Sequence, residues 1–205
     1  MTRAKADAKP ASKASPKVPT GAGQIRIIGG QWKHTRLPVA KLAGLRPTPD
    51  RVRETLFNWL GQDLGGWQVI DVFAGTGALG FEAASRGAAE VLMVEQDAAL
   101  VPSLRGLKDK LKADAVRVQR GDGVAALNAF APGSADLVLL DPPFDAAALF
   151  APALAAAART VRADGFVYLE APQAWDDAAL AESGLRLHRH LKAGAVHAHL
   201  LRRSA

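Results

Sequence analysis

The residues Asp141-Pro142-Pro143-Phe144 place a carboxylate, two prolines and an aromatic ring directly after the largely apolar run 136–140. Because proline lacks a backbone donor and fixes φ, a strand formed by that run must end here and turn stiffly. The Asp141 carboxylate and the Pro142 carbonyl both accept hydrogen bonds, which suits the exocyclic amino group of a flat base, and the Phe144 ring can stack on such a base. These three residues are the predicted catalytic residues, although a proline-rich loop without chemistry would have the same composition.

Glycines form a second pattern: Gly75, Gly77 and Gly80 follow another apolar run with the spacing G-x-G-x-x-G. Glycine lets the backbone turn tightly and approach a ligand closely, and this spacing is the fingerprint of dinucleotide cofactors. Glu95 ends the next predicted strand, where a carboxylate can accept from both ribose hydroxyls. The fingerprint alone does not distinguish a nicotinamide cofactor from another adenosine cofactor.

Three carboxylates favour S-adenosylmethionine over a nicotinamide cofactor. Asp71 stands shortly before Gly75, where it can face a cationic amino-acid moiety but would repel a pyrophosphate. Asp122 follows the third predicted strand, where it can accept from the adenine amino group or, as the simpler alternative, cap a helix. Asp141 would lie beside the transferred methyl group. The predicted cofactor-binding residues are Thr48, Asp71, Phe73, Gly75, Thr76, Gly77, Glu95, Asp122 and Gly123.

Alternating strands and helices would position these residues. Apolar runs predict strands, and helical periodicity predicts helices between them; the strands are 68–73, 90–95, 115–120, 135–140 and 165–170, and the helices are 78–86, 98–111, 123–130 and 147–162. This order predicts βαβ units and a parallel sheet, whose carboxyl edge binds ligands. Residues 185–191 and 195–203 alternate in polarity around 192–194 and predict an antiparallel hairpin. The predicted fold is therefore α/β, a Rossmann-like class I S-adenosylmethionine-dependent methyltransferase fold with an N-terminal β/helix extension.

The N-terminal quarter of the chain differs in composition from the rest. Residues 1–22 have almost nothing to bury and predict a disordered basic arm. Residues 23–47 predict a β-hairpin extension, and residues 48–205 the catalytic domain. Thr48 and Pro49 predict the N-cap and first position of a helix whose apolar face includes Val52 and Leu56.

Charge is concentrated in the same part of the chain. Residues 1–20 contain five basic residues and one acidic residue, and residues 21–54 contain seven and two, so that the remainder of this chain of net charge +6 is acidic. A strongly basic N-terminal segment followed by a mildly acidic remainder of the chain predicts a polyanionic partner. The candidates for phosphate contacts are Arg26, Lys33, Arg36, Arg46, Arg51 and Arg53; a pair between Arg53 and the nearby Glu54 is the alternative for that arginine.

Composition also limits the classes of protein. The 205 residues are 49% hydrophobic and include no cysteine, which excludes disulfides and thiolate metal sites and fits a cytoplasmic protein. No run of eighteen apolar residues predicts a membrane span, and no apolar stretch near the N-terminus predicts a signal peptide. Four histidines, His188, His190, His197 and His199, share the predicted hairpin, but polar positions on an edge hairpin explain them more simply than a metal site. No metal is expected, and the protein is expected to be a monomer.

Several segments resemble one known family, the RsmD family of bacterial ribosomal RNA methyltransferases. The glycine turn is generic among methyltransferases, whereas the Gly29-Gly30 segment and the block around Arg51 are much more specific. The matching segments span residues 25 to about 200 and are 27–32, 46–48, 50–58, 71–82, 141–144 and 192–194.

This resemblance implies methyl transfer from S-adenosylmethionine to the N2 amine of a flipped guanine in 16S ribosomal RNA, the family target being guanine 966. The substrate would be this RNA or a small-subunit ribonucleoprotein. The loop chemistry itself indicates only an amine, so adenine N6 stays an alternative. Two further readings are a nicotinamide-dependent oxidoreductase, which leaves the Asp141 loop unexplained, and an RNA-binding protein without catalysis, which has no need of Asp71, Gly75, Gly77 and Asp141 together.

Overall fold

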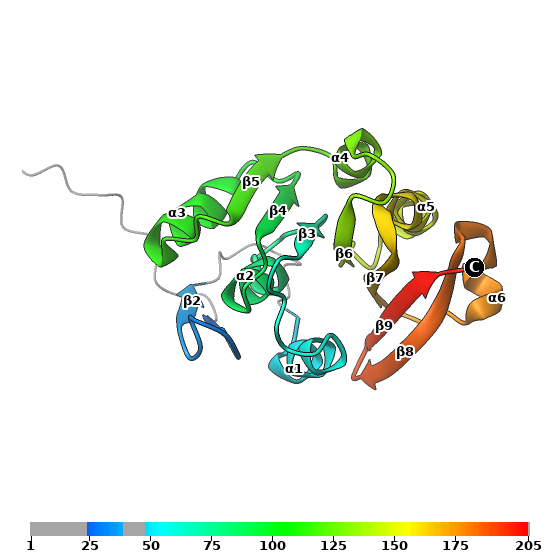
Figure 1. The fold of residues 1–205 in the computed structure, drawn as a ribbon, viewed down its shortest axis with the longest axis horizontal. Helices are drawn as coiled ribbons and strands as arrows, with labels where there is room; N and C mark the ends of the chain where they lie inside the picture. Colours follow the sequence, from blue (N-terminus) through cyan, green and yellow to red (C-terminus); the bar gives the residue numbers. More distant parts are fainter. Residues whose placement is uncertain (1–23, 39–47, 205) are drawn as a thin grey trace, which may run out of the picture.

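The computed structural model describes residues 24–38 and 48–204 and contains a seven-stranded sheet flanked by helices (Figure 1). The strand order in this sheet is β5-β4-β3-β6-β7-β9-β8. Its strands are β3 (Gln68–Asp71), β4 (Glu90–Glu95), β5 (Val116–Arg120), β6 (Ala135–Leu140), β7 (Val161–Ala171), β8 (Leu185–Ala193) and β9 (Val196–Arg203).

Strands β3 to β7 pair in parallel, whereas β9 pairs antiparallel with both β7 and β8. The strand order reverses between β3 and β6, where the chain has crossed from one half of the sheet to the other. A ligand is expected at such a switch point, beyond the carboxyl ends of the strands. The predicted Rossmann-like fold with an antiparallel C-terminal hairpin is confirmed.

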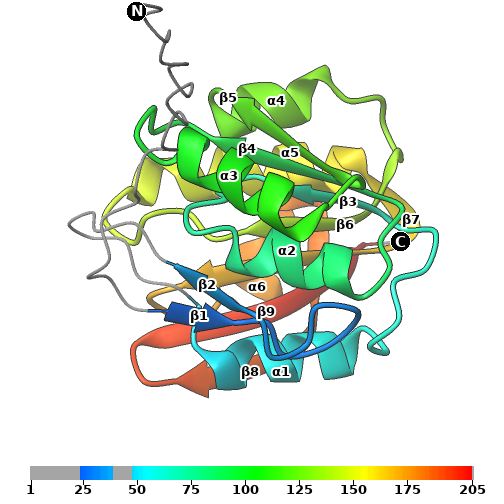
Figure 2. The same ribbon diagram turned by 90° about the vertical axis from the view of Figure 1, so that its left-hand side faces the viewer.

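Helices cover both faces of the sheet (Figure 2). One core joins the sheet to α1, α2 and α3, and a second core joins the opposite face to α4, α5 and α6. The helices are α1 (Asp50–Trp59), α2 (Ala78–Ser85), α3 (Val101–Leu111), α4 (Gly123–Ala129), α5 (Phe150–Thr160) and the single turn α6 (Asp177–Leu180); 3₁₀ turns cover Ala147–Leu149 and Ala181–Ser183. Each predicted helix is present, whereas the segment from α6 to Ser183 was not predicted.

Two predicted boundaries are wrong for identifiable reasons. The helix predicted over 147–162 begins as a 3₁₀ turn and ends at Thr160, because Val161 already pairs with Ala135 at the start of β7. Thr48 is not the N-cap of α1; Pro49 takes that position with extended backbone angles and no side-chain cap. The Thr48 side chain is instead buried.

The N-terminal strands β1 (Gln24–Arg26) and β2 (Arg36–Pro38) form a separate antiparallel pair. Ile25, Ile27 and Leu37 are buried in the core that also contains α1 and α2. This pair lies on the same side of the sheet as α1 (Figure 2). The predicted arm, residues 1–22, and residues 39–47 lie outside the described residues.

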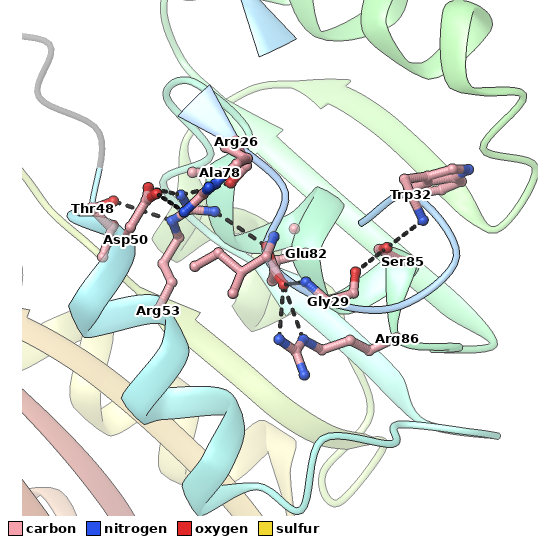
Figure 3. Close-up of polar contacts among 12 residues, drawn as sticks. Arg26, Gly29, Trp32, Thr48, Asp50, Arg53, Ala78, Glu82, Ser85 and Arg86 are labelled. Carbon is pink, nitrogen blue, oxygen red and sulfur yellow. Dashed lines mark hydrogen bonds and ion pairs between the residues drawn. The ribbon is translucent and has the colours of Figure 1, made fainter. Parts of the chain in front are cut away.

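A single buried carboxylate, that of Glu82 in α2, attaches this N-terminal segment to the domain that contains the large sheet (Figure 3). Glu82 accepts from the backbone N–H groups of Ile28 at 2.9 Å and Gly29 at 2.8 Å. It also pairs with Arg53 at 3.2 Å and with Arg86 at 3.0 Å. Backbone amides and guanidinium groups therefore supply all the donors that a fully buried carboxylate requires.

Close backbone contact completes this attachment. Gly30 has φ +73°, and a Cβ atom on it would lie 1.8 Å from the Ser85 carbonyl oxygen. The amide of Gln31 donates to that same carbonyl, and the amide of Trp32 donates to the Ser85 hydroxyl (Figure 3). Only glycine permits both the positive φ and the approach to α2, which explains the Gly29-Gly30 pair that the sequence displays.

Among the described residues, no helix has the length and apolarity that crossing a lipid bilayer requires.

Candidate active site at the carboxyl edge of the sheet

The glycine turn and the Asp141 loop leave neighbouring strands at the same edge of the sheet. β3 and β6 are parallel and hydrogen-bonded, with Asp71 in register with Leu139. The turn that follows Asp71 and the loop that begins at Asp141 are therefore adjacent, although seventy residues separate these two acids in the chain. This adjacency is the geometry that methyl transfer between ligands of the two loops would require.

The glycine turn has the backbone conformation that its sequence indicates. Gly75 and Gly77 have φ +50° and +81°, and Gly77 precedes the first residue of α2. A Cβ atom on Gly77 would lie 2.7 Å from the Phe81 ring and 2.8 Å from Leu104. The turn thus brings the N-terminus of α2, the positive end of its helix dipole, close to the edge of the sheet. Thr76 and Phe73 lie in the turn and are partly exposed there.

Asp71 is buried at the end of β3 and has one oxygen without a partner. Its Oδ2 accepts from the amide of Gly80 at 3.0 Å, whereas none of the described residues bonds to its buried Oδ1. Burial and, to a smaller extent, the charges of Glu95 and Glu170 raise the pKa of Asp71 to about 7, despite the lowering effect of the Gly80 amide. An unpaired carboxylate oxygen in a buried position is costly, and a cationic ligand group would compensate it.

Glu95 at the end of β4 has a structural bond on each oxygen. Oε2 accepts from the amide of Gly75 and Oε1 from the amide of Asp97, both at 2.7 Å. A carboxylate offers about four lone-pair sites, so one site on each oxygen stays available for a ribose hydroxyl. Glu95 therefore fixes the glycine turn and can still bind a ligand.

Asp122 caps helix α4 through Oδ1, which accepts from the amide of Ala125 at 2.7 Å. The capping alternative is thus correct, but Asp122 is exposed at the same edge of the sheet, and its second oxygen stays available. The adjacent Gly123 packs against β3: a Cβ atom there would lie 2.5 Å from the Val72 carbonyl oxygen. Both predicted residues border the edge at which the other cofactor candidates lie.

The Asp141 carboxylate forms a cluster with Glu170, which ends β7, and with Thr48, which precedes α1. Burial raises the pKa of Asp141 well above its usual range, and the charges of Glu170 and Asp71 raise it further. Burial likewise raises the pKa of Glu170. The Thr48 side chain lies beside both carboxylates and lowers both pKa values. Because the charge of each acid raises the pKa of its neighbour, the cluster disfavours ionisation of both acids at once.

Tyr168 extends the cluster into the sheet. It is fully buried, and its hydroxyl donates to Glu170 Oε1 at 2.9 Å. Burial and the neighbouring charge of Glu170 raise the pKa of Tyr168 well above its usual value, so this hydroxyl keeps its proton. The Tyr168 hydroxyl thereby fixes the position of the Glu170 carboxylate, which lies beside Thr48 and Asp141.

The loop after Asp141 presents an acceptor and a ring. None of the described residues donates to the Pro142 carbonyl, whereas the Pro143 carbonyl accepts from the amide of Ala146 at 3.0 Å and forms the turn. Phe144 is 37% exposed and is the one exposed large hydrophobic side chain among the described residues. The loop therefore offers the carboxylate, the carbonyl and the ring that its sequence predicts.

The basic candidates separate into two groups. Arg26, Lys33, Arg36 and Arg51 are exposed, and Arg46 lies outside the described residues. Arg53 as a phosphate contact is a wrong prediction, because its side chain is 0% exposed. Its guanidinium pairs with Asp50 at 2.6 Å and with Glu82, not with Glu54, and bonds the carbonyls of Thr48 and Arg26.

The histidines are not arranged as a metal site. His199 is buried, with Nδ1 next to the Leu169 carbonyl and Nε2 accepting from the amide of Trp175 at 3.0 Å. Burial lowers the pKa of His199 to about 4, so it is neutral at physiological pH. His190 and His197 contact each other at 3.0 Å. The described residues include no group of three or more ligands suited to a metal ion.

Two residues of the acid cluster were not predicted. Neither Glu170 nor Tyr168 is among the site residues that the sequence predicts. The sequence did contain a signal for Glu170, which is an acid at the carboxyl end of an apolar strand. The carboxyl ends of all parallel strands lie at the same edge of the sheet, so such an acid is expected near the site.

The chain is similar to several known proteins. Ribosomal RNA small subunit methyltransferase D of Escherichia coli is 49% identical over 125 residues, which cover 61% of this chain and 63% of that protein. The protein of the same name from Haemophilus influenzae is 40% identical over 62% of this chain and 68% of its own length. The solved structure of the Escherichia coli protein yhhF superposes with a TM-score of 0.74 at 36% identity, covering 89% of this chain and 99% of that one.

The family model described as conserved hypothetical protein 95 matches residues 25–202, a range that lacks only Gln24 of β1 and Arg203 of β9 among the residues in strands. The segments that displayed the resemblance fall within this range. The chain therefore belongs to the RsmD family.

Proposed function

We propose that this protein methylates ribosomal RNA, transferring a methyl group from S-adenosylmethionine to the N2 amine of a guanine in 16S RNA. The observation that supports this best is the adjacency of Asp71 and Asp141 on neighbouring parallel strands. The names of the relatives from Escherichia coli and Haemophilus influenzae support ribosomal RNA as the substrate. Guanine 966 is the proposed target, and action on this RNA would place the protein in the cytoplasm.

The residues at the edge of the sheet fit the proposed cofactor. The unpaired Oδ1 of Asp71 suits its cationic amino-acid portion, and the free lone pairs of Glu95 suit the ribose hydroxyls. Asp122 would accept from the adenine amino group, with Phe73, Gly75, Thr76, Gly77 and Gly123 lining the site. Thr48 would act from its place beside Asp141. When bound, the cofactor supplies a methyl group activated by a sulfonium charge.

The chain itself would act on the amine. Asp141 and the Pro142 carbonyl would each accept one N–H of the amino group, which directs the nitrogen lone pair toward the methyl group. Positioning of this kind contributes several kcal/mol, and the Asp141 charge stabilises the positive charge that develops on nitrogen. After transfer the nitrogen loses one proton, and Asp141 accepts it. Phe144 would stack on the base, which must leave its RNA stack to reach the loop.

Cofactor affinity should depend on pH through Asp71. The pKa of this acid is about 7 in the free protein, and an adjacent cation should lower it. Binding then releases a proton below pH 7, so affinity should rise by up to tenfold per pH unit from pH 5 to pH 7 and level off above it. Calorimetry of cofactor binding in buffers of different ionisation enthalpy measures both the affinity and the released proton.

Asp71→Asn is the matched variant for this measurement. It keeps the shape of the side chain but cannot ionise, so it should bind the cofactor more weakly and without that proton release. A wild-type affinity that is constant from pH 5 to pH 8 would contradict the role assigned to Asp71. The neighbouring acids Glu95 and Glu170 would then be the remaining candidates for contact with the cationic group.

The function itself is tested by nucleoside mass spectrometry of 16S RNA after incubation with the protein and labelled cofactor. We expect one labelled N2-methylguanosine per RNA. Labelled N6-methyladenosine would assign the alternative base, and RNA binding without any label would refute an enzymatic function. Deproteinised RNA and assembled small subunits, tested separately, identify the substrate form.

A further inference from the structure

The C-terminal hairpin β8–β9 carries positive charge without any negative charge, which the net charge of the whole chain does not reveal. Residues 185–204 contain five basic residues and no acidic residue, although the chain beyond residue 54 is acidic as a whole. The five, here called the hairpin cations, are Arg186, Arg189, Lys192, Arg202 and Arg203. None of them forms an ion pair with a carboxylate among the residues that the structure describes.

The arrangement of the hairpin cations costs stability. Arg186 and Arg202 are directly opposite each other on antiparallel strands, and like charges in such a pair repel. Arg202 is turned onto the Phe166 ring, 4.3 Å from its centroid. Between these arginines, burial and the charges of Arg202, Arg189 and Arg186 lower the pKa of His188. An anion from outside the chain would remove this repulsion.

The structure also has a place for an anionic group at the base of the hairpin. A surface hollow of about 410 Å³ is lined by Ala163, Arg186, Arg203 and Ser204. Two guanidinium groups and a hydroxyl are the donors that phosphate oxygens prefer. None of these four residues belongs to the active site described above.

The hairpin is connected spatially to that site. His197 and Ala198, near the start of β9, pair with Ala171 and Glu170 at the end of β7, so the β8–β9 turn lies at the carboxyl edge of the sheet. Lys192 lies next to this turn, opposite His197. From Lys192 to Arg186 the outer strand runs about 20 Å away from the edge, at 3.3 Å per residue. Within residues 24–38 and 48–204, β8 is the last strand of the sheet and no strand pairs with its outer edge (Figure 1).

We propose that the outer strand β8 binds the phosphate backbone of the RNA whose base enters the Asp141 loop. This proposal rests on the proposed function and names a second contact surface for the same substrate. Lys192 contacts the backbone near the flipped base, Arg189 the phosphates beyond it, and Arg186 with Arg203 a phosphate in the hollow. The exposed basic residues Arg26, Lys33 and Arg36 lie on or between β1 and β2, which belong to a separate two-stranded sheet, so the RNA has a second basic surface to contact.

The test is the salt dependence of RNA binding by the full chain with Arg186→Gln, Arg189→Gln and Lys192→Gln combined. Each lost phosphate contact reduces the slope of log affinity against log salt by about 0.7 to 0.9, so the slope should fall by about 2 to 3. The matched control, Arg105→Gln with Lys108→Gln and Lys110→Gln, removes the same charge from α3, which packs on β5 at the opposite end of the sheet. Its slope should stay within one unit of that of the wild type.

Thermal unfolding provides a second measurement, because the hairpin variant loses the repulsion between Arg186 and Arg202 and should unfold at the wild-type temperature or above it. Equal slopes for the hairpin variant and the α3 control would overturn the proposal. So would equally salt-dependent binding of polyglutamate, which would indicate an acidic protein surface as the partner. Methyl transfer to 16S RNA by the wild type distinguishes the two claims. If transfer occurs but the salt slope of the hairpin variant equals that of the wild type, only the RNA contact of β8 is refuted. If the slope of the variant is reduced but the wild type transfers no methyl group, only the enzymatic function is refuted.

Discussion

Replacing Asp141 by alanine should reduce the rate of methyl transfer by about 10²- to 10³-fold, the loss typical of removing one group that stabilises transition-state charge. The carboxylate lies at the end of β6 beside Glu170 and Thr48, and no other described acid occupies the loop position that would face the amine. The loss should appear in the rate of a single turnover at saturating cofactor, because the interaction is made mainly in the transition state. Cofactor affinity should change much less.

Asp145→Ala is the control for this variant, since Asp145 is an exposed acid in the same loop. It removes the same charge from the loop but not from the buried cluster, and its turnover should be close to that of the wild type. Near-normal turnover by Asp141→Ala would refute the mechanism proposed for the amine, whatever the substrate is.

Glu82→Gln should lower the free energy of unfolding by about 3–5 kcal/mol, the cost of breaking a buried ion pair. Glu82 accepts from Ile28, Gly29, Arg53 and Arg86. Glutamine has one acceptor oxygen and adds two N–H donors, so Arg86 would stay buried without a negative partner and Arg53 would keep only Asp50. For a chain of this size the unfolding temperature should fall by roughly 10 °C.

Urea and thermal unfolding measure this loss, with Glu90→Gln as the control. Glu90 pairs with Arg117 at 3.5 Å on the surface, where a salt bridge contributes at most about 1 kcal/mol. A Glu82→Gln protein as stable as the Glu90→Gln protein would show that the network around Glu82 does not support the fold.

The sequence predicts the large sheet well because its signals are local. Apolar runs, helical periodicity and the glycine after α2 each depend on neighbouring residues; this glycine, Gly87, follows the C-cap Arg86 and has φ +94°. The Asp141 loop was predicted for the same reason, since two prolines end any strand. The adjacency of this loop to the glycine turn then follows from the rule for parallel strands.

The failures come from contacts between distant parts of the chain. Arg53 lies off the apolar face of α1, a position that indicates an exposed side chain. In the structure the N-terminal segment covers that side of α1, and the Glu82 carboxylate of α2 pairs with the Arg53 guanidinium. Glu170 looks exposed from its position at a strand end, yet Thr48 and the Asp141 loop bury it. The spacing of residues in the sequence cannot identify these contacts, because the residues that cover Arg53 and Glu170 lie many positions away and on other elements.

The contacts of Glu82 have a consequence for protein engineering. The carboxylate joins the peptide before β2 to the helix that starts at the glycine turn, so the first strands are not a detachable module that could be exchanged between relatives. A chimera that takes the N-terminal segment from another protein should fold only if α2 is transplanted with it, and deletion of residues 24–38 should disturb the glycine turn as well as the surface.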